Sequence, residues 1–293
     1  MASNDRFGRN YSLTVQYGEG QNVVIALPFT LEFDVNRNDY SSSNVSSLRV
    51  YGLAPDTRNK LRKDLQGGLG AVTKRMILRA GYGSNLVEIL NANMKQGFSY
   101  REGNTFITEM DAYDAGGAFA NSQTSREWIA GTDQKQILSD IISDLKPWGI
   151  SEGQISNAFG GAIPTGNSYS GVTCDLLKQL TNGNFFIDNG KAHCLAEGDC
   201  IQGVLTTINA DTGLLGTPRR FQSVMDFDIL FEPRLLIGQF LNLVSSTGDG
   251  FNGTHKVIKI HHKGTISDAI CGDAITSVRC EFGTFNLAGA SSP

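Results

Sequence analysis

The sequence lacks the features of a membrane, secreted or nucleic-acid-binding protein. No apolar run in its 293 residues approaches the roughly 20 that a membrane-spanning helix needs. Residues 1–9 contain no apolar stretch that could serve as a secretory signal. The net charge is −4, and neither end gathers the Lys and Arg that displace counterions from nucleic acid. We therefore expect a soluble protein made in the cytoplasm, with no membrane partner and no DNA-binding surface.

Proline and paired cysteine motifs are also scarce, whereas glycine is abundant. Seven prolines against 34 glycines indicate many turns and bulges between strands and no disordered linker. The five cysteines are an odd number without C-x-x-C spacing, so we expect reduced thiols, most of them buried. The length leaves room for about two domains, each with its own core.

Residues 8–116 show the period of two that is typical of strands. Residues 11–17 alternate with Tyr11 and Leu13 on one face, and residues 23–35 predict one long strand in which Pro28 marks an edge or a bulge. Four more strands are expected, at residues 45–53, 76–80, 86–94 and 105–112. Residues 56–69 carry four basic side chains and two glycines, so they predict an exposed loop that could contact an acidic neighbouring subunit.

Residues 117–200 change to the period of a helix. Asp133 is a candidate N-cap with Gln136 in capping-box position, and Pro147 is expected to end the helix. The apolar stripe of this helix consists of Ile137, Leu138, Ile141, Ile142 and Leu145. A second helix is predicted over residues 173–181, with Val172, Leu176, Leu177 and Leu180 on its buried face. Asn189-Gly190 between two apolar runs predicts a type I′ hairpin, because both turn residues need a positive φ.

Residues 201–293 return to short apolar runs separated by Gly, Pro, Asp and Asn clusters, the pattern of strands and tight turns. The sequence therefore predicts a mainly β fold with a small α+β insertion that carries two short helices. The expected domains are two antiparallel β domains at residues 1–116 and 201–293, which flank a small α+β domain at residues 117–200.

Two motifs resemble ligand sites but lack an essential part. Residues 161–168 have the spacing of a phosphate-binding loop, yet Asn167 stands where the lysine is required and no strand–helix alternation surrounds it. His255, His261 and His262 lie close together, but the last two are adjacent on an expected strand and point to opposite faces. Neither motif predicts a cofactor-binding or metal-ligating residue.

Carboxylates that could form a hydrolase pair occur in two groups: Asp226, Asp228 and Glu232, and Glu109, Asp111 and Asp114. Asp226 and Asp228 fit the solvated side of an ordinary alternating strand, and no aromatic cluster accompanies the carboxylates for stacking sugar rings. The nucleophile motif G-x-S-x-G is absent. We therefore expect no catalytic residue and no enzyme.

Several segments together resemble the baseplate hub proteins of contractile-tail bacteriophages. Residues 78–82 and 100–114 resemble the first domain of that family, and residues 136–145 and 174–190 resemble its middle region. Residues 213–218, 230–240 and 253–264 are similar to its second domain. The resemblance extends from about residue 10 to residue 283, and its specificity lies in the order and spacing of the segments. The chain is shorter than the better-known long hubs, so we expect large inserted or C-terminal domains to be absent.

The resemblance implies a fold and a role. Both β domains would be tail-tube-like barrels, and a homotrimeric ring would join the six-fold tail tube to the three-fold central spike and line the DNA channel. The implied partners are the spike, the tail tube, other baseplate proteins and, as a further candidate, the tape measure protein. The implied location is the virion baseplate, after synthesis and assembly in the host bacterial cytoplasm. The alternatives are a tail-tube or tube-initiator subunit and a tail-associated peptidoglycan hydrolase.

Overall fold

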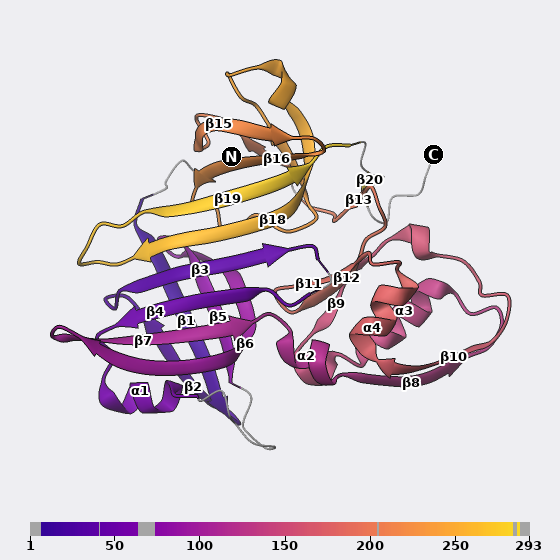
Figure 1. Cartoon of the computed structure of the whole chain (residues 1–293), viewed down its shortest axis with the longest axis horizontal. Coiled ribbons are helices and arrows are strands. Elements are labelled where there is room, and N and C mark those ends of the chain that lie inside the picture. The colour runs from indigo at the N-terminus through magenta and orange to yellow at the C-terminus, as the bar shows by residue number, and fades with distance from the viewer. Residues whose placement is uncertain (1–6, 41, 64–73, 204, 284–285, 288–293) are drawn as a thin grey trace.

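The computed structural model describes residues 7–40, 42–63, 74–203, 205–283 and 286–287. Most of its strands belong to one large sheet, and the helices of the middle block gather at one side, apart from the N-terminal helix at residues 55–61 (Figure 1). The mainly β fold with a small helical part is therefore confirmed. No helix in the described part of the chain is both long and apolar enough to cross a bilayer.

The N-terminal elements form a curled sheet around the first core. They are β1 (Arg9–Gly18), β2 (Gln21–Ala26), β3 (Leu31–Asn38), β4 (Val45–Tyr51), α1 (Pro55–Leu61), β5 (Arg75–Tyr82), β6 (Asn85–Glu102) and β7 (Thr105–Tyr113). Inward residues alternate with outward ones along β1 and β3, as the period of two predicts. This alternation supplies fully buried side chains, including Tyr11, Leu13, Leu31, Leu48 and Met110.

Two expectations for this block are wrong. Residues 23–35 do not form one strand, because a turn with a cis Leu27–Pro28 peptide separates β2 from β3. Residues 55–61 form α1 rather than a loop, with Pro55 in its first turn and Leu61 fully buried. Proline suits that position because its missing N–H has no helical partner there. The last part of the predicted loop, residues 64–69, lies outside the described residues.

The middle elements pack around a separate core beside the first sheet. They are α2 (Gly116–Asn121), β8 (Gln123–Trp128), α3 (Gln134–Ser143), the 3₁₀ turns η1 (Lys146–Trp148) and η2 (Asn157–Phe159), β9 (Ser151–Ile155), β10 (Asn167–Val172), α4 (Thr173–Leu180), β11 (Phe185–Asp188) and β12 (Lys191–Cys194). The predicted stripe of α3 is buried, and Asp133 caps the helix by accepting from the Lys135 amide. The hairpin at Asn189-Gly190 is confirmed, with φ of 47° and 71°.

Four details of the middle block differ from the expectation. The block holds a third α-helix, α2, which follows a left-handed Ala115 and is too short for an apolar period. The helix α3 ends at Ser143, before Pro147, which instead lies in η1. Gln136 does not complete a capping box, because its side chain donates to Asp140 one turn further along. Of the buried face predicted for the second helix, Leu176 and Leu177 are buried, whereas Val172 and Leu180 are partly exposed.

The last elements extend the large sheet. They are β13 (Asp199–Cys200), β14 (Thr206–Ile208), β15 (Leu214–Phe221), β16 (Val224–Leu230), β17 (Phe240–Leu243), the turn η3 (Asp249–Phe251), β18 (Gly253–Ile266), β19 (Ala274–Glu281) and β20 (Asn286–Leu287). Strand β18 pairs antiparallel with β3, so the sheet continues from the last block into the first. Beneath it lies a second core, distinct from the first. Phe231, Ile266 and Ala274 nevertheless contribute to the first core, and the three domain limits stay a prediction.

The sheet contains the same arrangement of five strands twice. Its order is β5-β6-β7-β4-β3 in the first block, and β17-β18-β19-β16-β15 in the last. In both blocks, two hairpins pair with each other, through β4 and β7 in the first and through β16 and β19 in the last. The longer strand of the second hairpin, β6 or β18, also pairs with the strand that precedes it, β5 or β17. The irregularities match as well: β6 bulges against β7 between Met94 and Gln96, and β18 bulges against β19 between Val257 and Lys259. The chain therefore carries an internal structural repeat.

Candidate functional site

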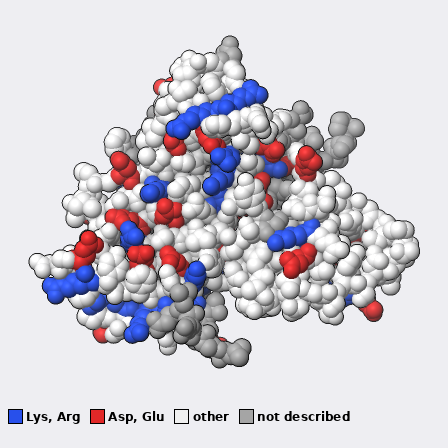
Figure 2. All heavy atoms as spheres, viewed as in Figure 1, with Lys and Arg blue, Asp and Glu red and all other residues white. Residues whose placement is uncertain are grey.

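The main candidate is the outward face of eight adjacent strands, in the order β15-β16-β19-β18-β3-β4-β7-β6. We call it the polar face. On β3 and β19, every second residue is buried and the residues between point outward. Lys, Arg, Asp and Glu alternate over this surface without a large area of one sign (Figure 2). The outward charged residues include Glu32, Asp34, Arg49, Glu109, Asp111, Arg219, Asp226, Asp228, Lys259, Lys263, Arg279 and Glu281.

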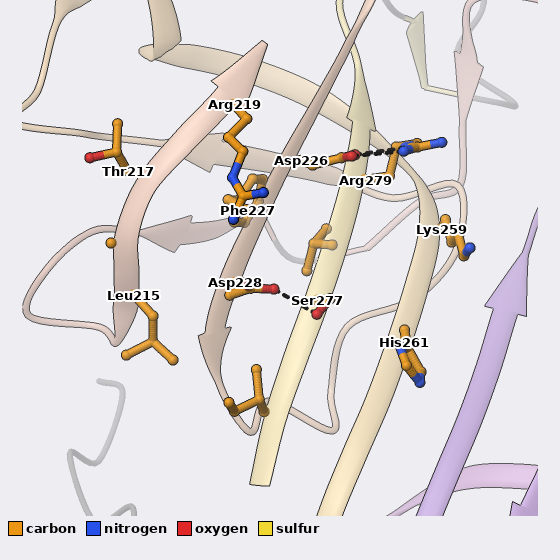
Figure 3. A pocket seen from close by; sticks show the side chains of 13 residues that line it. Leu215, Thr217, Arg219, Asp226, Phe227, Asp228, Lys259, His261, Ser277 and Arg279 are labelled. Atoms are coloured by element: carbon orange, nitrogen blue, oxygen red, sulfur yellow. Dashed lines mark hydrogen bonds and ion pairs between the residues drawn. The ribbon is translucent and has the colours of Figure 1, made fainter. Parts of the chain in front are cut away.

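Neighbouring strands neutralise much of this charge locally. Arg279 binds Asp226 with both ends of its guanidinium, at 2.6 and 2.7 Å. Asp228 accepts a hydrogen bond from Ser277 at 2.6 Å, and Arg49 donates to Glu109 at 3.0 Å. These contacts cross the sheet between directly paired strands, and Figure 3 shows those of Asp226 and Asp228. The face therefore offers paired charges rather than a field of one sign.

Two shallow hollows lie on the polar face. The larger, of about 580 Å³, is lined by β15, β16, β18 and β19 and includes Arg219, Lys259 and His261 (Figure 3). The smaller, of about 300 Å³, lies where β18 meets β3 and β4. Both are open to solvent, and neither has the deep apolar enclosure that a small-molecule site requires.

The candidate hydrolase carboxylates are not brought together as an acid and a base. Asp226 and Asp228 share the polar face as predicted, but both are held by neighbours, and Glu232 lies beyond β16, where it binds Arg234 at 2.9 Å. In the second group, Glu109 and Asp111 accept from Arg49 and Gln96. Asp114 is buried on the opposite side of the sheet. The geometry therefore gives no pair of carboxylates across an open cleft.

The three histidines lie in different environments. His261 contacts Asp34 at 2.9 Å on the polar face, whereas His262 is fully buried and bonds Thr276 at 2.9 Å. His255 bonds the Phe251 carbonyl. Burial lowers the pKa of His255 and His262, so both are neutral at pH 7. Within the described residues, no three His, Cys, Asp or Glu side chains are placed to hold a metal ion.

The loop at residues 161–168 faces the N-terminus of α3, but that position is already filled. The Asp133 carboxylate accepts from the amides of Lys135 and Gly161, at 3.0 and 3.1 Å. A bound phosphate would need those same donors and would meet a negative charge there. The loop then continues into β10 rather than into a helix.

A buried ion pair joins the three blocks, and the sequence reasoning missed it. Arg37 of β3 donates two hydrogen bonds to Asp188 of β11, at 2.7 and 2.6 Å, and one to the Leu235 carbonyl at 3.2 Å. Its side chain is 2% exposed. Burial, and then the nearby Asp188, raise the pKa of Asp114 well above its usual range. The sequence did carry a signal for the burial of Arg37, because this residue continues the inward period of two set by Leu31, Phe33 and Val35.

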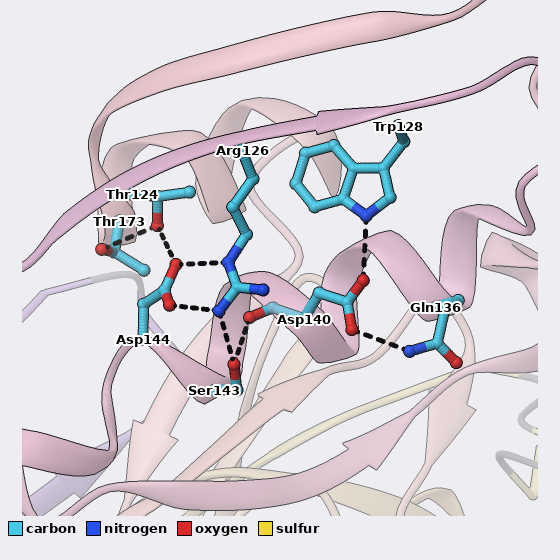
Figure 4. A network of polar contacts seen from close by, with 8 residues as sticks. All are labelled: Thr124, Arg126, Trp128, Gln136, Asp140, Ser143, Asp144 and Thr173. Atoms are coloured by element: carbon cyan, nitrogen blue, oxygen red, sulfur yellow. Dashed lines mark hydrogen bonds and ion pairs between the residues drawn. The ribbon is translucent and has the colours of Figure 1, made fainter.

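A second polar network fixes the β8–β10 ribbon to the helices of the middle block (Figure 4). Arg126 of β8 binds Asp144 with both ends of its guanidinium, and Trp128 donates to Asp140 at 2.8 Å. Burial alone would raise the pKa of Asp144, but the hydrogen bonds from Arg126 and Thr124 lower it. Because every carboxylate in the network is hydrogen-bonded, the network is an anchor rather than a reactive site.

Comparisons of structure find the same fold in tail proteins. The prophage MuSo2 43 kDa tail protein from Shewanella oneidensis aligns over 92% of this chain and 96% of its own, with a TM-score of 0.57 and 10% identity. The tail protein of Neisseria meningitidis MC58 aligns over 94% and 97%, with a TM-score of 0.54 and 8% identity. The E. coli c3393 protein, a type VI secretion system component described as similar to T4 tail proteins gp27 and gp5, aligns over 90% and 77%, with 0.55 and 9%.

No protein-family model and no curated protein matches the sequence. The resemblance drawn from the sequence segments is confirmed at the level of the fold, which this chain shares with these tail proteins over nearly its whole length.

Proposed function

We propose that the chain is a structural baseplate hub that forms a homotrimeric ring between the tail tube and the central spike. The internal repeat carries this proposal. One chain holds two equivalent five-strand units joined edge to edge through β3 and β18. Three copies around an axis then present six such units, which lets a three-fold spike meet a six-fold tube.

The repeat also separates the hub from its nearest alternative. A tail-tube or tube-initiator subunit contributes one unit to a six-fold ring, whereas two units in one chain favour a three-fold ring. The tail-protein fold over nearly the full length of the chain supports a role in the virion tail. The peptidoglycan hydrolase is the weaker alternative, because the candidate carboxylates are engaged by Arg, Gln and Ser side chains. In this role the protein acts through shape and buried interfaces, without turnover.

The polar face would line the channel of the ring. Arg279 and Arg49 are paired with carboxylates across strands, and the other charges of both signs are interspersed (Figure 2), so the face offers phosphates no broad basic surface to bind. DNA would then pass without specific contacts. The middle block would lie outside the sheet, where it is available to other baseplate proteins.

Light scattering of the purified chain tests the proposal. We expect the mass of a trimer, alone or with a candidate spike protein, and images of the ring should show six similar lobes around the channel. A hexamer would favour the tube subunit instead. A stable monomer that binds no spike would contradict the hub. Clearing of purified cell wall in a zymogram would favour the hydrolase.

A further inference from the structure

The junction between the two units gives a template for the junction between copies. Inside the chain, β18 of the last block pairs antiparallel with β3 of the first, from Lys259 opposite Asn38 to Ile266 opposite Leu31. In the repeat, β18 is equivalent to β6, and β3 is equivalent to β15. The equivalent of the internal junction is therefore β6 against β15, which lie at opposite ends of the polar face.

Both of those strands have an open edge. Among the described residues, no strand pairs with the outer edge of β15, nor with that of β6 beyond Gly97. Gly97 itself exchanges backbone hydrogen bonds with Lys63. Because backbone groups alternate along a strand, Ser99 and Arg101 direct theirs to the same open edge. Open edges of this kind are templates for pairing with another chain.

Because the bulges of β6 and β18 match, the residues of the two strands can be aligned one by one. Gln96 and Lys259 are the first residues after the bulge, so Phe98 is equivalent to His261 and Tyr100 to Lys263. In the internal junction, those two β18 residues lie opposite Asn36 and Asp34.

The residues paired across the intervening strands allow β15 to be aligned with β3 in the same way. The residues opposite Gln96 and Lys259 are Asp111 and Arg279, which in turn pair with Ser47 and Asp226. Ser47 pairs with Asp34, and Asp226 pairs with Arg219. Arg219 is therefore equivalent to Asp34, and Phe221, two residues further along, is equivalent to Asn36.

We propose that β6 of one copy pairs antiparallel with β15 of the next, with Phe98 opposite Phe221 and Tyr100 opposite Arg219. This inference rests on the proposed ring. Its direction is consistent, because rotation about an axis along the strands preserves strand direction, and β6 and β15 run oppositely in this sheet.

The side chains at this register are complementary. Phe98, Tyr100 and Phe221 are 41%, 37% and 54% exposed in the single chain, which is unusual for aromatic residues on a charged face. Phe98 and Tyr100 already stack, with ring centroids 6.0 Å apart. Phe221 would extend that stack, and the guanidinium of Arg219 would lie against the Tyr100 ring. Pro218 falls opposite Arg101 and has no N–H to donate, so this pair lacks one backbone hydrogen bond.

Disulfide trapping tests this register. Since Ser99 and Arg101 direct their backbone groups across the junction, Phe98 and Phe221 form the pair without hydrogen bonds, whose side chains come closest. We expect Phe98→Cys with Phe221→Cys, in a Cys271→Ser background, to give covalent dimers and trimers on a non-reducing gel after oxidation. Phe98→Cys with Val244→Cys, a pair of similar exposure that lies apart at this register, should give none.

The possible outcomes distinguish a wrong register from the absence of a trimeric ring. A trimer by light scattering that gives no Phe98–Phe221 link, or links the control pair equally, overturns the register and leaves the hub standing. A chain that stays monomeric with candidate spikes overturns both. If the first double variant does not assemble, Tyr100→Cys with Arg219→Cys tests the same register. A Phe221→Arg variant should also weaken trimer association about tenfold or more, whereas Val244→Arg should not.

Discussion

Removing Arg37 should detach the middle block from the sheet. Arg37→Met keeps the apolar stem but deletes the hydrogen bonds to Asp188 and the Leu235 carbonyl. Asp188 then stays buried without its cation, because its side chain is only 7% exposed. Breaking a buried pair in this way costs about 3–5 kcal/mol. Leaving the Leu235 carbonyl without a donor adds roughly 1 kcal/mol.

A double variant isolates the buried charge as the cause. Arg37→Met with Asp188→Leu removes both charges and leaves only the Leu235 carbonyl without its donor. We therefore expect it to be about 3 kcal/mol more stable than Arg37→Met alone, since apolar replacement of a buried ion pair is often close to neutral. The difference in stability between the two variants tests the buried charge more directly than either cost alone, because both variants lack the Arg37 side chain and differ only at Asp188.

Urea unfolding followed by two probes would measure the effect. The chain's two tryptophans, Trp128 and Trp148, both lie in the middle block, whereas circular dichroism reports mainly on the large sheet. In Arg37→Met, the fluorescence transition should move to lower urea than the circular dichroism transition, and the double variant should bring them together again. Equal losses in both variants, or a loss below about 1 kcal/mol in the single variant, would refute the reasoning.

Three further predictions concern other parts of the fold. Burial raises the pKa of Asp39 to about 6. The folded state therefore holds this proton more tightly than the unfolded state, so stability should fall by ~2 kcal/mol as the pH rises from about 4 to 6; Asp39→Asn should flatten urea midpoints over that range. Arg126→Ala should cost about 1 kcal/mol, since this pair is partly exposed, and should speed amide exchange in β8 and β10. If the polar face lines the channel, Glu32→Lys and Glu281→Lys should slow DNA release from particles, whereas Glu197→Lys in the middle block should not; unchanged release in the first two would count against that lining.

Local chemistry made two features of the middle block predictable. Asn189-Gly190 needs two positive φ values, and Asp133 supplies an acceptor to the first turn of α3, so both features depend on residues a few positions apart. The prediction of one strand over residues 23–35 failed for the opposite reason. Its apolar period continues through the turn at Pro28, and the Tyr11 hydroxyl, which binds the Phe29 carbonyl at 2.7 Å, comes from another strand.

The candidate surface was only partly predictable. Alternation placed Asp226 and Asp228 together on one face, but not their partners Arg279 and Ser277, which come from a strand about 50 positions away. The resemblance implied two similar barrels, but not how their residues align, because the strands match in order and bulge position while the aligned side chains differ, as Tyr100 and Lys263 do. The pairing of strands supplied that alignment.

The duplication limits which rings this chain can build. Because each copy contributes two units, any closed ring of it contains an even number of units, and a ring of five or seven cannot form. Half of the junctions in such a ring, those between β3 and β18, are completed when the chain folds. The loss of translational and rotational entropy on association then falls only on the other half. A chain that carries two units therefore fixes an even number of units per ring, and its copies need fewer successful encounters to close the ring.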